Sequence, residues 1–147
     1  MAQWYEKSSD LLKFEKQCWL DVLHDFNNPQ ADLKFDYDSY KRFCVELTLP
    51  ITVDDIHRLF QFHIVYMTGF PNKNHRCPAS NLIRAYPMGT YNQNFHHLYR
   101  DQNGIPYVCQ AEMVEGTQIN GYTVAQHLLR WCTLYILYET RGVTLDV

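Results

Sequence analysis

The spacing of hydrophobic residues along this chain changes from a helical period to a strand period and back, which predicts the order of its elements. Residues 9–26 have apolar side chains on one broad stripe of a helix. Ser8 or Ser9 can cap its first turn, and the turn formers and proline at 27–30 end it, because proline cannot continue a helix. The stripe consists of Leu11, Leu12, Cys18, Trp19, Val22, Leu23 and Phe26.

Residues 31–66 alternate apolar and polar side chains, which is the pattern of strands. Three such runs follow one another, at residues 33–37, 43–49 and 60–66. Their connections are too short for crossover helices, so we expect an antiparallel meander with one face against which the first helix can pack. A fourth short strand fits residues 82–86.

Residues 87–121 have no clear periodicity, which predicts a long irregular loop. Loops of this length are unusual in compact domains and are commonly functional. Helical spacing returns at residues 122–141, with Gly142 as a stop signal. A sheet-rich middle between two helices, without a repeat or a linker, predicts one α+β domain over residues 1–147.

Composition and charge narrow the classes of function. The 147-residue chain is 46% apolar, which is enough for one continuous core. Its 13 basic residues are scattered among 16 acidic ones, so no basic stripe supports nucleic-acid binding. The N-terminal segment lacks the pattern of a secretory signal, and no stretch approaches the ~20 apolar residues that span a bilayer. We therefore expect a cytoplasmic protein with no nucleic-acid and no membrane partner.

The five cysteines have wide, unrelated spacings and no Cys-x-x-Cys pair, which argues against a disulfide framework or a zinc knuckle. Cys77 beside His75 is a weak zinc signal because no second pair of ligands accompanies it, so we expect no metal and no cofactor. Most of these thiols should be small buried hydrophobes. Cys109 differs because it lies in the irregular segment, although its apolar run also fits the core residue of a short strand.

Three segments resemble ubiquitin-conjugating enzymes, and together with the order of elements they cover nearly the whole chain. GFPNKNHRCP at 69–78 is similar to the family's Tyr-Pro or Phe-Pro turn, followed by a second proline before the fourth strand. HHLYRDQNGIPYVCQ at 96–110 is similar to its run of a histidine, turn residues, an Asn-Gly or Asp-Gly, and the catalytic cysteine. HLLRWCTLYILYETRG at 127–142 resembles the closing helix of bacterial relatives from antiphage operons, including those acting with cyclic-oligonucleotide signalling enzymes.

The resemblance implies a ubiquitin-conjugating-enzyme-like fold and makes Cys109 the thioester-forming residue. A thiolate attacks an activated acyl group, and the thioester that results stays reactive toward an amine. The candidates for orienting the loop, stabilising an oxyanion or relaying a proton are His97, which is slightly favoured, His96, Tyr99 and Asn103. Because His96 and His97 are adjacent, we expect their side chains to face different directions.

The resemblance also implies partners. The chain has no Gly-rich nucleotide-binding fingerprint and no adenylating segment, so a separate activating enzyme would have to supply the activated acyl group. The cargo would be a ubiquitin-like modifier or the C-terminus of a cyclic-oligonucleotide synthase. The acceptor would be an amine of a protein target, in bacterial antiphage defence.

Two departures from the family pattern keep a second function open. His97 is followed by Leu98 and Tyr99 instead of the family's proline and asparagine, and Gly104 is two residues farther from Cys109 than is common. These differences favour a catalytically inactive module that binds a protein partner through its sheet edge or its loop. A small-molecule thiol hydrolase or a zinc enzyme is the least supported class, because no Cys-His-Asp order or dense ligand cluster stands out.

Overall fold

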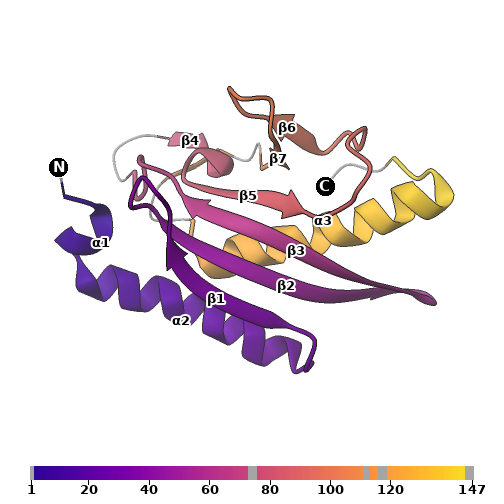
Figure 1. The fold of residues 1–147 in the computed structure, drawn as a ribbon, viewed down its shortest axis with the longest axis horizontal. Helices are drawn as coiled ribbons and strands as arrows, with labels where there is room; N and C mark the ends of the chain where they lie inside the picture. Colours follow the sequence, from indigo (N-terminus) through magenta and orange to yellow (C-terminus); the bar gives the residue numbers. More distant parts are fainter. Residues whose placement is uncertain (1, 73–75, 111–112, 116–118, 145–147) are drawn as a thin grey trace.

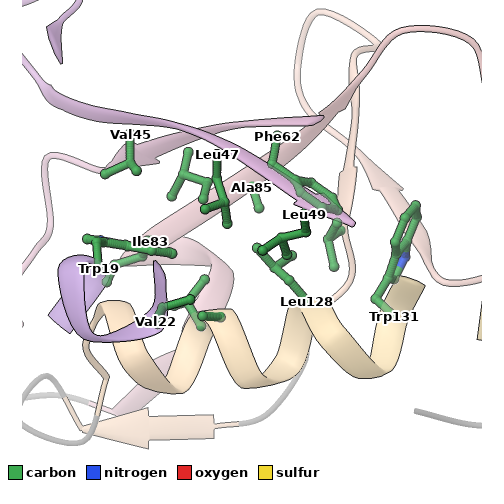
Figure 2. Close-up of a cluster of buried hydrophobic side chains, with 14 of the residues drawn as sticks. Trp19, Val22, Val45, Leu47, Leu49, Phe62, Ile83, Ala85, Leu128 and Trp131 are labelled. Carbon is green, nitrogen blue, oxygen red and sulfur yellow. The ribbon is translucent and has the colours of Figure 1, made fainter. Parts of the chain in front are cut away.

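A computed structural model describes residues 2–72, 76–110, 113–115 and 119–144. Its architecture is α+β, as the sequence predicts, with an N-terminal helical region, a four-stranded antiparallel sheet and a C-terminal helix (Figure 1). The two long helices lie on the same face of the sheet, so the molecule has two layers with the core between them (Figures 1 and 2).

The N-terminal region contains a short helix that the sequence pattern did not predict, α1 (Trp4–Lys7), because four residues cannot display a helical period. Helix α2 (Ser9–Phe26) has the predicted bounds. Ser8 is its cap, since the Ser8 side chain accepts a hydrogen bond from the Leu11 N–H at 3.2 Å.

Helix α3 (Gly121–Arg141) begins one residue before the predicted start. The Asn120 side chain accepts a hydrogen bond from the Thr123 N–H at 2.9 Å, and the Asn120 N–H donates to the Thr123 hydroxyl at 3.1 Å. Gly142 ends the helix with a φ of 67°, a left-handed conformation that glycine adopts without steric cost. Among the described residues, no helix is long and apolar enough to cross a bilayer.

The main sheet confirms the predicted meander. It consists of β1 (Asp32–Tyr37), β2 (Phe43–Val53), β3 (Ile56–Tyr66) and β5 (Ile83–Met88), in the order β1-β2-β3-β5 with every neighbouring pair antiparallel. The fourth strand is two residues longer at its end than the predicted 82–86. Because the side chains of a strand alternate between its two faces, one apolar set points toward the helices.

The core lies between that face of the sheet and the helices α2 and α3 (Figure 2). Trp19 from α2 and Trp131 from α3 are both fully buried there. A buried hydrogen bond of 2.9 Å from the Trp19 indole N–H to the Tyr66 hydroxyl joins α2 to the end of β3. Figure 2 labels ten of the core residues: Trp19, Val22, Val45, Leu47, Leu49, Phe62, Ile83, Ala85, Leu128 and Trp131.

The segment 87–121 is more regular than predicted. It contains β6 (Leu98–Arg100) and β7 (Pro106–Val108), which form an antiparallel hairpin, and β8 (Met113–Glu115). Strand β8 pairs with β4 (Arg76–Pro78), and a 3₁₀ turn over 79–81 leads from β4 to β5. The prediction of a structureless loop was therefore wrong, because strands of three residues are too short to show an alternating period.

Candidate active site

The hairpin of β6 and β7 holds Cys109 next to the sheet. The hairpin lies beside β5, and Cys109 directly follows β7 (Figure 1). The Cys109 N–H donates a hydrogen bond of 3.0 Å to the His97 carbonyl, so the ladder continues one pair beyond the assigned strands. Gly104 turns the tip of the hairpin with a φ of 76°, as its place in an Asn-Gly dipeptide predicts.

Helix α3 fixes the base of this hairpin through two hydrogen bonds to backbone carbonyls. His127 Nε2 lies 2.8 Å from the Cys109 carbonyl oxygen, and the Trp131 indole N–H donates to the His97 carbonyl at 3.1 Å. The two side chains are one helical turn apart and therefore point the same way. Because a carbonyl oxygen only accepts, His127 carries a hydrogen on Nε2.

His127 was missed by the sequence reasoning. It lies in the middle of the last helix, 18 residues from Cys109, and the only local signal is its spacing of four from Trp131. Its Nδ1 lies 3.5 Å from Nη2 of Arg130, which can donate to it. Only the packing of α3 beneath the hairpin brings the imidazole to the Cys109 backbone.

The thiol environments separate the cysteines into two groups. Cys18, Cys44 and Cys132 are buried, whereas Cys77 and Cys109 are half-buried. Burial raises the pKa of the Cys18 thiol, that of Cys44 to about 12, and that of Cys132 well above its ordinary value. These three thiols are therefore held in the unreactive protonated form.

Tyr99 is the predicted site residue whose side chain reaches Cys109. In the ladder Tyr99 lies opposite Tyr107, and Cys109 is two residues beyond Tyr107 on the same face of the hairpin. The Cys109 side chain raises the pKa of Tyr99, first through hydrogen bonding and then through the charge of the ionised thiol. With 42% of its surface exposed, Tyr99 stands beside the thiol at a solvent-accessible edge.

The two histidines lie before β6 and differ in burial. His97 is buried and His96 is exposed. Their rings contact each other, with centroids 3.9 Å apart, and both rings also lie edge-on to Phe95. One side chain is thus buried and the other exposed, but the rings stay in contact because residues 96 and 97 form a turn and not an extended strand. His97 contributes its backbone carbonyl to the site, as the acceptor from Cys109 and Trp131.

Asn103 is not brought to the thiol. It lies in the turn between β6 and β7, at the opposite end of the hairpin from Cys109. Its backbone N–H donates to the Asp101 carboxylate at 2.9 Å, and the Ile105 N–H donates to the same oxygen at 2.9 Å. Asn103 therefore belongs to a turn that the Asp101 side chain closes.

The described residues contain no group of three or more His, Cys, Asp or Glu side chains that could hold a metal ion. The sulfur of Cys77 lies 3.8 Å from the Asn72 amide nitrogen, whereas His75 lies outside the described residues. The groups at Cys109 are a half-buried thiol, the exposed Tyr99 phenol and a backbone that α3 holds through two hydrogen bonds.

Comparisons of the chain with protein-family models, with curated proteins and with solved structures return no significant match. Function is therefore inferred from the atoms around Cys109 and from the sequence segments that resemble ubiquitin-conjugating enzymes.

Proposed function

We propose that this protein is a ubiquitin-conjugating-like transferase that carries an acyl cargo as a thioester on Cys109 and passes it to an amine. The observation that carries the proposal is a half-buried thiol with a hydroxyl neighbour, on a hairpin whose backbone is tied to a long helix. Such a thiol is open to a protein tail, while its position is fixed by rigid elements. The antiparallel meander with helices on one face also agrees with the proposed ubiquitin-conjugating-enzyme-like fold.

The transfer has two steps, and each forms and breaks one bond. In the first, the Cys109 thiolate attacks the activated carbonyl carbon of the cargo, and the activating group leaves. In the second, an amine attacks the thioester, the C–S bond breaks, and the thiolate is restored as the amine loses a proton. The Tyr99 hydroxyl is the described side chain placed to donate a hydrogen bond near the sulfur in either step.

The resemblance to ubiquitin-conjugating enzymes suggests the cargo of the transfer and the process in which it takes part. The cargo is a ubiquitin-like modifier or the C-terminus of a cyclic-oligonucleotide synthase, supplied by a separate activating enzyme. The acceptor is an amine of a protein target, in bacterial antiphage defence in the cytoplasm. The protein itself works without a cofactor, because the thiol supplies the chemistry.

The test is adduct formation with a cognate activating enzyme, its cargo protein and ATP. Wild-type protein should form an adduct that a thiol reagent cleaves. Cys109→Ser should form a more stable oxyester, and Cys109→Ala should form none. Cys77→Ala is the matched control, because Cys77 is also half-buried. An adduct that persists undiminished in Cys109→Ala would refute the transferase.

A second function, an inactive module that binds a protein partner, is favoured by one specific observation. His97 is buried and Asn103 lies at the far end of the hairpin, so neither of these candidates reaches the thiol from an exposed position. Rates of alkylation with iodoacetamide distinguish the two functions. The transferase requires Cys109 to react at least about tenfold faster than the three buried thiols and faster than Cys77. An inactive module should bind its partner equally well with Cys109→Ala.

A further inference from the structure

A polar pocket of about 370 Å³ lies between β5 and the turn of the β6–β7 hairpin. Its walls include two guanidinium groups, two phenol rings and the polar residues of the turn. The transfer chemistry proposed above uses none of them. The residues that matter here are Arg84, Tyr86, Arg100, Asp101, Asn103 and Tyr107.

The guanidinium of Arg84 is held in one position inside this pocket. It lies over the ring of Tyr107, 4.2 Å from the centroid. Its Nε–H donates to the Ser80 carbonyl at 3.1 Å, and its Nη2 donates to Asn81 Oδ1 at 3.3 Å. A guanidinium has five N–H donors, so Arg84 has further donors for a ligand without losing these bonds. The cation is therefore oriented before any ligand binds.

The pocket has an excess of positive charge. Arg84 and Arg100 line it together with one carboxylate, Asp101. One oxygen of Asp101 accepts hydrogen bonds from the backbone of its own turn, and the other accepts one from the Tyr86 hydroxyl at 3.1 Å. The carboxylate thus acts as a fixed part of the wall, and the remaining positive charge favours an anionic ligand.

The pocket is connected to Cys109 by the face of the hairpin. The Arg84 guanidinium lies over the Tyr107 ring, and that ring lies edge-on to Tyr99 with centroids 6.0 Å apart. Tyr99 and Cys109 lie on the same face of the hairpin. Tyr107 and Cys109 are two residues apart on one strand face, about 7 Å along the strand. An extended peptide covers about 3.5 Å per residue, so the third or fourth residue of a cargo tail on Cys109 can reach the Arg84 pocket.

We infer that this pocket binds a carboxylate side chain of the acyl cargo, three or four residues from the carbonyl that Cys109 attacks. The inference rests on the proposed transferase function and adds a substrate preference to it. A planar carboxylate matches the fork of a guanidinium and can accept two hydrogen bonds from it. The tyrosine hydroxyls and the amide of Asn103 surround that position with further polar groups.

Three synthetic peptide thioesters test this preference without an activating enzyme. Each is a hexapeptide of Gly and Ala with glutamate, glutamine or lysine fourth from its C-terminus. The C-terminal carbonyl forms a thioester with N-acetylcysteamine, a neutral thiol that leaves when Cys109 attacks and takes up one proton. Mass spectrometry follows single-turnover acylation of Cys109. The glutamate peptide should react about fivefold faster than the glutamine peptide, and the lysine peptide slowest.

Variants of Arg84 and Arg100 test whether the pocket causes the preference for the glutamate peptide. Arg84→Gln should reduce the ratio of the glutamate and glutamine rates to about one, and Arg100→Gln should lower it. Arg141→Gln is the matched control, because it removes the same charge at the end of α3 and should leave the ratio unchanged. Equal rates for glutamate and glutamine in the wild type, or a preference that survives in Arg84→Gln, would overturn the inference.

A binding experiment separates failure of this inference from failure of the transferase. The same hexapeptides with an unreactive C-terminal amide are titrated against isotope-labelled protein by NMR. The glutamate peptide should shift the Arg84 Nε–H signal and the amide signals of residues 103–105 and Tyr107. If these shifts occur while no thioester acylates Cys109, the pocket is supported and the transferase is refuted. If Cys109 is acylated with no preference and no shifts, the pocket is refuted.

Discussion

His127 donates a hydrogen bond from its imidazole Nε2 to the backbone carbonyl of Cys109 across 2.8 Å. The two residues come from different parts of the chain, one from the middle of α3 and the other from the end of the β6–β7 hairpin. A bond to the backbone leaves the thiol itself free to react. His127 is therefore a positioning residue, which holds the peptide that carries the Cys109 thiol.

Replacing His127 should loosen this peptide without removing the thiol. In His127→Leu the Cys109 carbonyl loses its donor, which should lower the free energy of unfolding by about 1–2 kcal/mol. The rate of Cys109 alkylation should also change, whereas that of Cys77 should not. Denaturant unfolding and mass spectrometry measure the two effects. His127→Gln, which keeps a donor at a similar reach, should restore both, and failure of this rescue would exclude the positioning role.

The titration of Tyr99 should depend on Cys109. The hydrogen bond to Cys109 and the charge of the ionised thiol raise the pKa of Tyr99, so removing the sulfur should lower this pKa toward its ordinary value near 10.0. NMR of the Tyr99 ring across alkaline pH, in wild type and Cys109→Ala, measures the difference. Cys77→Ala should leave the Tyr99 curve unchanged. Identical curves in wild type and Cys109→Ala would show that the two side chains do not interact.

The contact between α3 and α2 depends on a glycine. A Cβ atom at Gly121 would lie only 2.5 Å from Nε1 of Trp19, a fully buried side chain. Gly121→Ala should therefore force the helices apart and lower the free energy of unfolding by about 1–3 kcal/mol. Gly69→Ala is the control, because its new methyl group would have no neighbour closer than 3.9 Å. Denaturant unfolding of both variants tests this, and equal stabilities would contradict the close approach.

The buried carboxylate of Glu15 should make the free energy of unfolding depend on pH, and the direction of this dependence can be predicted. Glu15 accepts hydrogen bonds from the Tyr66 hydroxyl and the Gly121 N–H, but burial is the larger influence and raises its pKa. The folded protein therefore binds this proton more tightly than the unfolded chain does. The stabilisation is fully present below the ordinary pKa near 4.5 and is lost as the pH rises through the raised value.

Glu15→Gln keeps an acceptor for both donors but does not ionise. The free energy of unfolding of the wild type, relative to that of Glu15→Gln, should therefore decrease as the pH rises above about 4.5. Thermal or denaturant unfolding of the two proteins over this pH range measures the difference. A constant difference would mean that Glu15 titrates alike in the folded and unfolded states.

Much of the fold was predictable because its long elements have long patterns. The 18 residues of α2 and the 11 residues each of β2 and β3 repeat their period often enough to be recognised. The short elements α1, β4, β6, β7 and β8 have only three or four residues each and were missed. The hairpin that carries Cys109 was missed for the same reason, because its strands β6 and β7 are too short to show a period.

The candidate site was predictable only in part. Cys109 and Tyr99 are ten residues apart, and both were predicted as site residues because they lie in one continuous segment, residues 96–110. Their side-chain contact was not foreseen, since it depends on the register of a hairpin that the pattern did not reveal. His127 and Arg84 lie outside that segment, so neither the contact of His127 nor the pocket that Arg84 lines was anticipated.

Local sequence patterns were enough to predict the order of the long helices and strands, the apolar faces that form the core, and Cys109 as the cysteine in a segment without a period. These properties depend on neighbouring residues, whose spacing fixes which side chains share a face. Which residues meet at Cys109 could be seen only in the folded protein, because it depends on how α3 packs beneath the hairpin and how the hairpin lies against β5. Contacts between distant segments arise from packing and register, which no local period encodes.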